Sequence, residues 1–155
     1  MADKIVVLDG FTLASGQSHH PDELTWQSVH ACGDLTVYDR TSPDQILERI
    51  ADHPIILTNK TPIDANIIAQ SPQLRYIGVL ATGVNVVDLE AAAKHNIVVT
   101  NIPGYSTDSV AQLVFGLLLD LTLKTSDHHH AVHQGQWARC DDFSFTVGST
   151  IELAG

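Results

Sequence analysis

The chain has 155 residues, of which 44% are hydrophobic and 17% are charged, and these values are ordinary for a folded globular protein and exclude a disordered one. Eighteen acidic against eight basic residues give a formal net charge of −10, and without a lysine or arginine cluster this balance argues against nucleic acid as a partner. The isolated Cys32 and Cys140 predict no disulfide framework or zinc site, and the apolar run Ile5–Leu8 is too short for a secretion signal, so a cytoplasmic protein is expected.

Short apolar runs alternate with amphipathic segments over the first 100 residues. Strands are predicted at 4–8, 35–38, 54–58, 76–80 and 97–100, and helices at about 22–31, 43–51, 62–70 and 86–95. The strand runs are continuous, which is typical of strands covered on both faces. This order predicts an α/β fold with a parallel sheet and right-handed crossovers, a compact flavodoxin-like unit over residues 1–100.

Capping residues support the helix assignments. Ser42 and Thr61 each precede a proline, so a hydroxyl cap is expected at the start of both helices. Asp64 follows Thr61 at the spacing of a capping box. Asn96 is expected to end the helix over 86–95 in a left-handed conformation.

A different kind of sequence begins at Pro103-Gly104, which predicts a break before a helix that opens near Ser106 or Thr107. Residues Val110–Leu123 are apolar on almost every face of that helix, although polar interruptions make the run too short to span a membrane. Such a helix must be covered all round, by a partner subunit or by another domain. Residues 124–155 are predicted to be a polar tail rich in loops.

The segment Ala81-Thr82-Gly83-Val84-Asn85 is the best local candidate for a binding site. It follows a predicted strand and opens a predicted helix, so its main-chain N–H groups could face a small anion. Ligands of open parallel sheets bind beyond the carboxyl ends of the strands, where this loop lies. The alternative is a plain turn in which Gly83 only relieves backbone strain.

Asn59 and Lys60 follow another strand end and could hydrogen-bond to and neutralise a small anionic substrate. The alternative is a solvated turn with Thr61 as a helix cap.

Two groups of residues suggest a metal site, namely His128, His129, His130 and His133, and Asp9, His19 and His20. Neither group has the spacing of a metal-ligand set, so no metal is expected. The sequence contains neither a G-x-S-x-G nor a G-x-G-x-x-G motif.

Several segments, taken in order, resemble the D-2-hydroxyacid dehydrogenase family. They are 80–88 (LATGVNVVD), 97–105 (IVVTNIPGY), 109–119 (SVAQLVFGLLL) and 134–137 (QGQW), followed by Phe143. The segments Thr58–Lys60 and Ile151–Gly155 resemble the glycerate dehydrogenase/hydroxypyruvate reductase branch. The resemblance covers essentially the whole chain.

The resemblance implies that residues 1–100 are the first part of a substrate-binding domain and that 101–155 begin a Rossmann nucleotide-binding domain, with 101–106 as the hinge. It implies that Ala81, Thr82 and Gly83 bind the substrate carboxylate, that Asn59 and Lys60 border the substrate, and that Val110 approaches the nicotinamide. The helix over 107–123 and the arm after it would form a homodimer interface.

The implied reaction is hydride transfer between NAD or NADP and a small 2-hydroxy or 2-keto acid of the glycerate/hydroxypyruvate type. The family's catalytic arginine and its His–Glu pair have no matching position, so no catalytic residue is assigned. The resemblance implies a chain truncated before the glycine-rich turn and inactive alone. The alternative is a non-catalytic dimerising or small-anion-binding α/β module. A receiver-type domain is disfavoured because the helix after residue 106 has no place in it.

Overall fold

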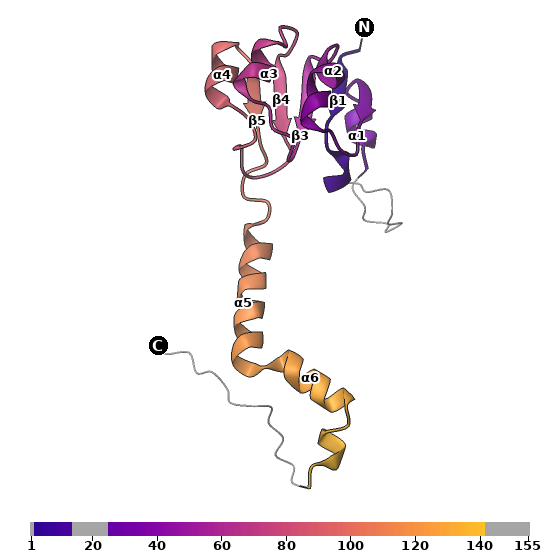
Figure 1. Cartoon of the computed structure of the whole chain (residues 1–155), viewed down its shortest axis with the longest axis vertical. Helices are drawn as coiled ribbons and strands as arrows, with labels where there is room; N and C mark the ends of the chain where they lie inside the picture. The colour runs from indigo at the N-terminus through magenta and orange to yellow at the C-terminus, as the bar shows by residue number, and fades with distance from the viewer. Residues whose placement is uncertain (1, 14–24, 142–155) are drawn as a thin grey trace. The chain divides into compact units, whose positions relative to one another are not determined.

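The computed structural model describes residues 2–13 and 25–141, and the chain divides into two compact units, Met1–Gly104 and Tyr105–Gly155. Figure 1 shows the sheet and its helices in the first unit and α5 and α6 in the second. The division falls at Gly104, whose φ of +72° lies in the left-handed region that favours glycine. Each unit is therefore described by itself.

The first unit contains one parallel sheet of five strands. Its strands are β1 (Lys4–Val7), β2 (Asp34–Val37), β3 (Ile55–Thr58), β4 (Tyr76–Val79) and β5 (Val98–Thr100), arranged in the order β2-β1-β3-β4-β5. All four pairings are parallel, and in register Val6 lies opposite both Thr36 and Ile56. The α/β class, the parallel sheet and all five strands predicted from the sequence are confirmed.

Three helices cover one face of this sheet. They are α2 (Ile46–Ile50), which continues the 3₁₀ turn η2 (Pro43–Gln45), α3 (Ala65–Ala69) and α4 (Leu89–Lys94). The main core lies between them and the sheet and consists largely of fully buried aliphatic side chains, among them Val6, Leu8, Ile46, Ile50, Ile56, Ile68 and Ile77. Burying each such side chain contributes about 1.5–3 kcal/mol, so this layer holds the strand ends in place.

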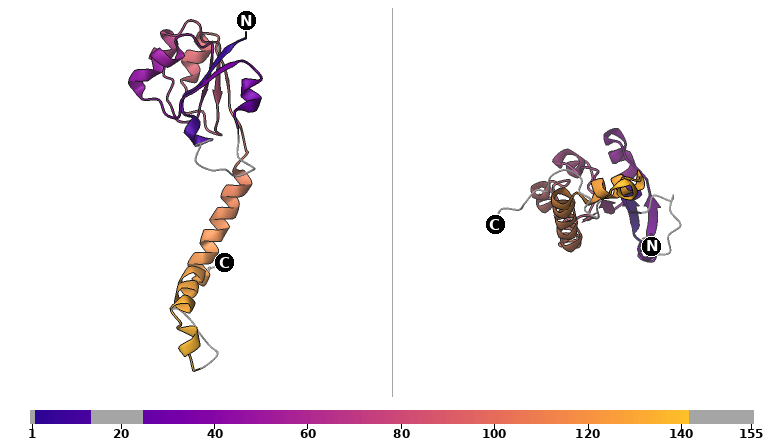
Figure 2. Two further views of the ribbon diagram at one scale, coloured as in Figure 1. Left: turned by 90° about the vertical axis from the view of Figure 1, so that its right-hand side faces the viewer. Right: turned by 90° about the horizontal axis from the view of Figure 1, so that it is seen from below.

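The opposite face of the sheet is covered only in part. Among the described helices of the first unit, α1 (Gln27–His30) packs here with the smaller core of Ile5, Val7 and Leu35. The left view of Figure 2 shows α1 on the side of the sheet away from α2. Tyr76 on this face is half-buried and Val98 is 57% exposed. The expectation that the strands are covered on both faces is thus wrong for this side within the described residues.

The helix caps differ from the predicted ones at one site. Ser42 is the expected cap and forms a capping box with Gln45, and Asn96 has the expected left-handed φ of 59°. The capping box expected from Thr61 and Asp64 does not form, because Asp64 is itself the N-cap of α3. Thr61, however, caps no helix: α3 begins one turn later, where the side chain of Asp64 accepts the N–H of Ile67 at 2.9 Å. An aspartate accepts such a bond as well as a hydroxyl does, and Thr61 is engaged elsewhere.

The second unit contains two consecutive helices, α5 (Thr107–Leu123) and α6 (Thr125–His133), and a 3₁₀ turn η3 (Trp137–Arg139). Lys124 lies between the helices at φ 52°, where α5 ends. The predicted start of α5 near Thr107 is confirmed. The predicted loop-rich tail is wrong for 125–133, which forms α6; in its first turn the N–H of Ser126 donates to the carboxylate of Asp120 at 2.9 Å. No described helix is long and apolar enough to cross a membrane.

Candidate functional site

The candidate site lies where β3 and β4 end on one edge of the sheet. The N–H of Leu80 donates to the carbonyl of Thr58 at 2.8 Å, so the two strands remain paired at their carboxyl ends. Asn59 and Lys60 leave the sheet after β3, and Ala81–Gly83 leave it after β4. The sequence therefore placed both candidate loops on the edge at which open parallel sheets bind ligands.

Two carbonyl groups of the loop after β4 are fixed by the chain that follows β5. The N–H of Ile102 donates to the Ala81 carbonyl at 3.0 Å, and Nδ2 of Asn101 donates to the Thr82 carbonyl at 2.7 Å. In a trans peptide the N–H points opposite to the C=O of the same unit. The N–H groups of Thr82 and Gly83 are therefore directed away from the connector that holds their carbonyls.

These two N–H groups remain available. Within the described part of the chain, neither the N–H of Thr82 nor that of Gly83 donates a hydrogen bond, and both residues are exposed. Successive main-chain N–H groups of a turn are donors that can hold an oxygen anion. The loop leaves two such donors without a partner among the described residues.

Gly83 is not explained by backbone strain. Its φ is outside the left-handed region, and a Cβ built on it would meet only Oδ1 of Asn85, at 3.1 Å. The alternative that Gly83 merely relieves a strained turn is therefore wrong.

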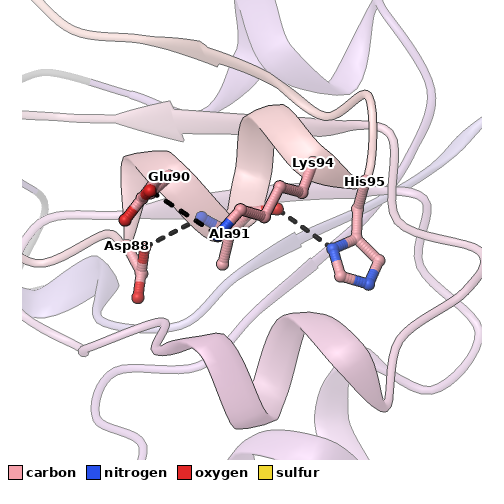
Figure 3. A network of polar contacts seen from close by, with 5 residues as sticks. All are labelled: Asp88, Glu90, Ala91, Lys94 and His95. Atoms are coloured by element: carbon pink, nitrogen blue, oxygen red, sulfur yellow. Dashed lines mark hydrogen bonds and ion pairs between the residues drawn. The ribbon is translucent and has the colours of Figure 1, made fainter.

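The helix that follows does not contribute to the anion site. We expected the 81–85 loop to open a helix directly, but α4 begins only at Leu89, and the Asp88 carboxylate accepts the Ala91 N–H at 2.9 Å. Figure 3 shows this cap beside the Lys94–Glu90 ion pair of 3.5 Å and the contact between His95 Nδ1 and the Ala91 carbonyl. The N-terminus of α4 already has its anion, so only the loop amides remain for a ligand.

The loop after β3 contains a second group of main-chain donors, and an internal carboxylate fills it. Asp9, 3% exposed at the end of β1, accepts the N–H of Asn59 at 2.9 Å, that of Thr61 at 2.8 Å and that of Lys60. The hydroxyl of Thr61 also donates to it, at 3.2 Å. This loop therefore offers side chains to a ligand, whereas its amides are occupied.

The side chains of Asn59 and Lys60 differ in their surroundings. Oδ1 of Asn59 is buried and has no hydrogen-bond partner within the described residues. Lys60 is exposed and lines a pocket of about 290 Å³ that also includes Asp9 and Arg40, whose guanidinium lies 3.5 Å from the centre of the Phe11 ring. No hydrogen bond or ion pair of the described chain joins Lys60 to Ala81–Gly83.

The remaining candidates lie in the second unit. Val110, in the first turns of α5, is 55% exposed. The rings of His129 and His133 meet edge-on with their centroids 4.4 Å apart, yet the described residues contain no group of three or more side chains that could hold a metal ion. His128 Nδ1 and His130 Nε2 instead contact the Lys124 carbonyl and the Gln134 side chain.

Two residues that shape the site, Asp9 and Asn101, are not predicted as site residues from the sequence. The sequence places Asp9 among possible metal ligands, although a polar residue directly after a buried strand on this edge is itself a signal. Asn101 is placed in the hinge. Its contact with Thr82 joins residues 19 positions apart, and no local pattern indicates such a contact.

The sequence model of a family described as D-isomer-specific 2-hydroxyacid dehydrogenase, catalytic domain, matches residues 12–153. The chain is 42% identical over 155 residues to a hydroxypyruvate reductase of Blautia hydrogenotrophica, an alignment that covers 98% of this chain and 46% of that protein. It is 34% identical to a glycerate dehydrogenase of Methylorubrum extorquens, with 100% and 47% covered. The chain thus spans about half the length of the curated relatives it matches.

Solved structures show the same fold. A 2-hydroxyacid dehydrogenase from Ketogulonicigenium vulgare superposes with a TM-score of 0.71 at 20% identity, covering 97% of this chain and 45% of that one. A glyoxylate/hydroxypyruvate reductase from Sinorhizobium meliloti, solved in complex with NADP and malonate, gives a TM-score of 0.65 at 20% identity, with 97% and 43% covered.

Proposed function

Because the chain belongs to the D-isomer-specific 2-hydroxyacid dehydrogenase family, we propose that it provides the substrate-carboxylate site of an NAD(P)-dependent reductase of small 2-keto acids. The observation that carries the proposal is the pair of outward N–H groups of Thr82 and Gly83, which have no partner among the described residues. A carboxylate oxygen accepts such donors strongly, because a charge-assisted bond is about twice as strong as a neutral one.

The substrate class follows from this contact and from the relatives. One of the two proteins aligned over nearly the whole of this chain is a hydroxypyruvate reductase, and the other is a glycerate dehydrogenase. A 2-keto acid of that size places its carbonyl one bond from the carboxylate. The loop amides would then fix the position of the carbon that is reduced.

Asn59 and Lys60 would border the rest of the substrate. The buried Oδ1 of Asn59 has no partner within the described residues, so a substrate hydroxyl could donate to it. The exposed ammonium of Lys60 would favour an anion at this edge of a strongly acidic protein. No residue of this chain is assigned to proton transfer.

A nicotinamide cofactor fits one described residue. Val110 offers an exposed apolar side chain near the start of α5, as suits the face of a nicotinamide ring. When bound, the cofactor supplies a hydride to the keto carbon, and with one proton the product is the 2-hydroxy acid. The unit from Met1 to Gly104 would be the first part of the substrate-binding domain, and the unit from Tyr105 would begin the nucleotide-binding domain.

We further propose that α5 pairs with α5 of a second copy. Eight of its nine large apolar side chains are more than half exposed, and only Leu118 is partly buried. The eight are Val110, Leu113, Val114, Phe115, Leu117, Leu119, Leu121 and Leu123. A contiguous apolar surface of this kind marks an interface. The expected cytoplasmic location remains part of the proposal and rests on the family alone.

The proposal is tested by titrating the ¹⁵N-labelled chain with hydroxypyruvate and following its amide resonances. We expect the Thr82 and Gly83 signals to move and saturate. Dihydroxyacetone, in which a hydroxymethyl group replaces the carboxylate, is the matched control and should leave them unchanged. Equal responses to both compounds, or none to hydroxypyruvate at millimolar concentration, would contradict the proposed carboxylate site.

A further inference from the structure

The direction of each loop amide depends on a different kind of contact. The Ala81 carbonyl is held by the main-chain N–H of Ile102, a bond that any residue except proline could make. The Thr82 carbonyl is held by the side chain of Asn101, at 2.7 Å. Only the second contact depends on the identity of a side chain.

The Asn101 contact controls one peptide unit, the one that joins Thr82 to Gly83. Because this unit is planar, fixing its carbonyl oxygen also fixes the opposite direction of the Gly83 N–H. Gly83 has no side chain and is exposed, so little else resists rotation of the peptide. Without the amide donor, water would solvate the Thr82 carbonyl in several orientations.

We propose that Asn101 is a positioning residue that keeps the Gly83 N–H directed at the substrate carboxylate; the inference rests on the proposed function. Its short amide reaches the Thr82 carbonyl directly from the end of β5, three strand positions after Val98. A leucine has a similar size but no donor, and an aspartate would set a carboxylate against the carbonyl.

Asn101→Leu tests this role without adding charge. One partly exposed hydrogen bond contributes about 1 kcal/mol, so we expect hydroxypyruvate to bind about fivefold more weakly. The Gly83 amide resonance should move already in the absence of ligand, and the Thr82 resonance should move less, because Ile102 still holds its peptide. Asn66→Leu is the matched control for the loss of an amide, because Asn66 is an exposed residue of α3 whose side chain hydrogen-bonds, within the described residues, to Gln70.

The melting temperatures of the two variants should be similar, which separates positioning from unfolding. Binding by Asn101→Leu as tight as that of the unsubstituted chain would overturn the role of Asn101 and leave the carboxylate site intact. A missing response in the unsubstituted chain would overturn the proposed function together with this role. A loss of binding in Asn66→Leu equal to that in Asn101→Leu would also overturn the inference.

Discussion

The carboxylate of Asp9 accepts the main-chain N–H of Thr61 at 2.8 Å, a bond that joins the end of β1 to the loop after β3 across 52 residues of sequence. The same carboxylate also accepts the N–H of Asn59 and of Lys60. One buried anion thus orders the loop that carries two of the proposed substrate contacts.

Asp9→Asn should destabilise the first unit by about 2–4 kcal/mol. The asparagine NH₂ group is itself a donor, so it cannot accept the hydrogen bonds of the buried N–H groups that it would face. Urea unfolding followed by circular dichroism measures the loss. Asp39→Asn, at an exposed position after β2, is the control and should change the free energy of unfolding little. Equal stability of the two variants would contradict the structural role of Asp9.

Substitution of two glycines by alanine should have different effects: at Gly78 it should lower the stability, and at Gly83 it should weaken ligand binding. At Gly78 a Cβ would lie 2.6 Å from Cδ2 of Leu57 and 3.2 Å from Cε1 of Tyr76, so Gly78→Ala should cost about 1–3 kcal/mol by overpacking. At Gly83 the only close atom belongs to the exposed Asn85. Gly83→Ala should therefore keep the melting temperature and weaken hydroxypyruvate binding, and unchanged binding would count against the carboxylate site.

Leu117→Glu on α5 should convert a dimer into a monomer in light scattering. Leu117 is 61% exposed in the isolated chain, and a charge there would be buried in the proposed interface. Leu89→Glu on α4, at a side chain 47% exposed in the first unit, is the matched control and should leave the mass unchanged. A monomeric unsubstituted chain would contradict the interface.

The junction between α5 and α6 should weaken in acid. Hydrogen bonds from the Thr125 hydroxyl and then from Ser126 hold the pKa of Asp120 below its usual value of 3.8. A lowered folded-state pKa stabilises the junction above about pH 3.8, and this stabilisation is lost as the pH falls through the folded-state pKa. Amide resonances of α6 recorded from pH 6 downward should follow this loss, and in Asp120→Asn they should not depend on pH in the same way.

The 155-residue chain alone should not oxidise NADH in the presence of hydroxypyruvate, because none of its residues matches the family's catalytic arginine or His–Glu pair. The absorbance of NADH at its maximum, followed with the chain at a concentration comparable to that of hydroxypyruvate, measures this. Stoichiometric turnover would contradict the assignment of no catalytic residue to the chain.

Local patterns predicted the sheet well because a buried parallel strand is recognisable from the few consecutive residues that form it. Each strand is a short apolar run, and the run Ile55–Leu57 pairs with both β1 and β4 as its composition suggests. The helix starts were less accurate. Asp64 and Asp88 cap α3 and α4 later than predicted, since proline and glycine mark the turn but not the first helical residue.

The site was predicted only in outline. The loop at Thr82–Gly83 could be placed at the strand ends from the order of strands and helices alone. Whether its amides are available depends on Asn101 and Ile102, which approach from another strand. The same holds for Asp9, whose partners lie about 50 residues away. Contacts of this range follow from the packed sheet and leave no periodicity in the sequence.

Because the apolar side chains of α5 are exposed, the stability of the two units should depend differently on protein concentration. A helix that is covered only by association gains stability by mass action, so its melting temperature rises with the amount of protein present. The sheet has its own core, and its melting temperature should not depend on dilution. Dilution should therefore unfold α5 first and leave a folded sheet that still presents the Thr82–Gly83 amides.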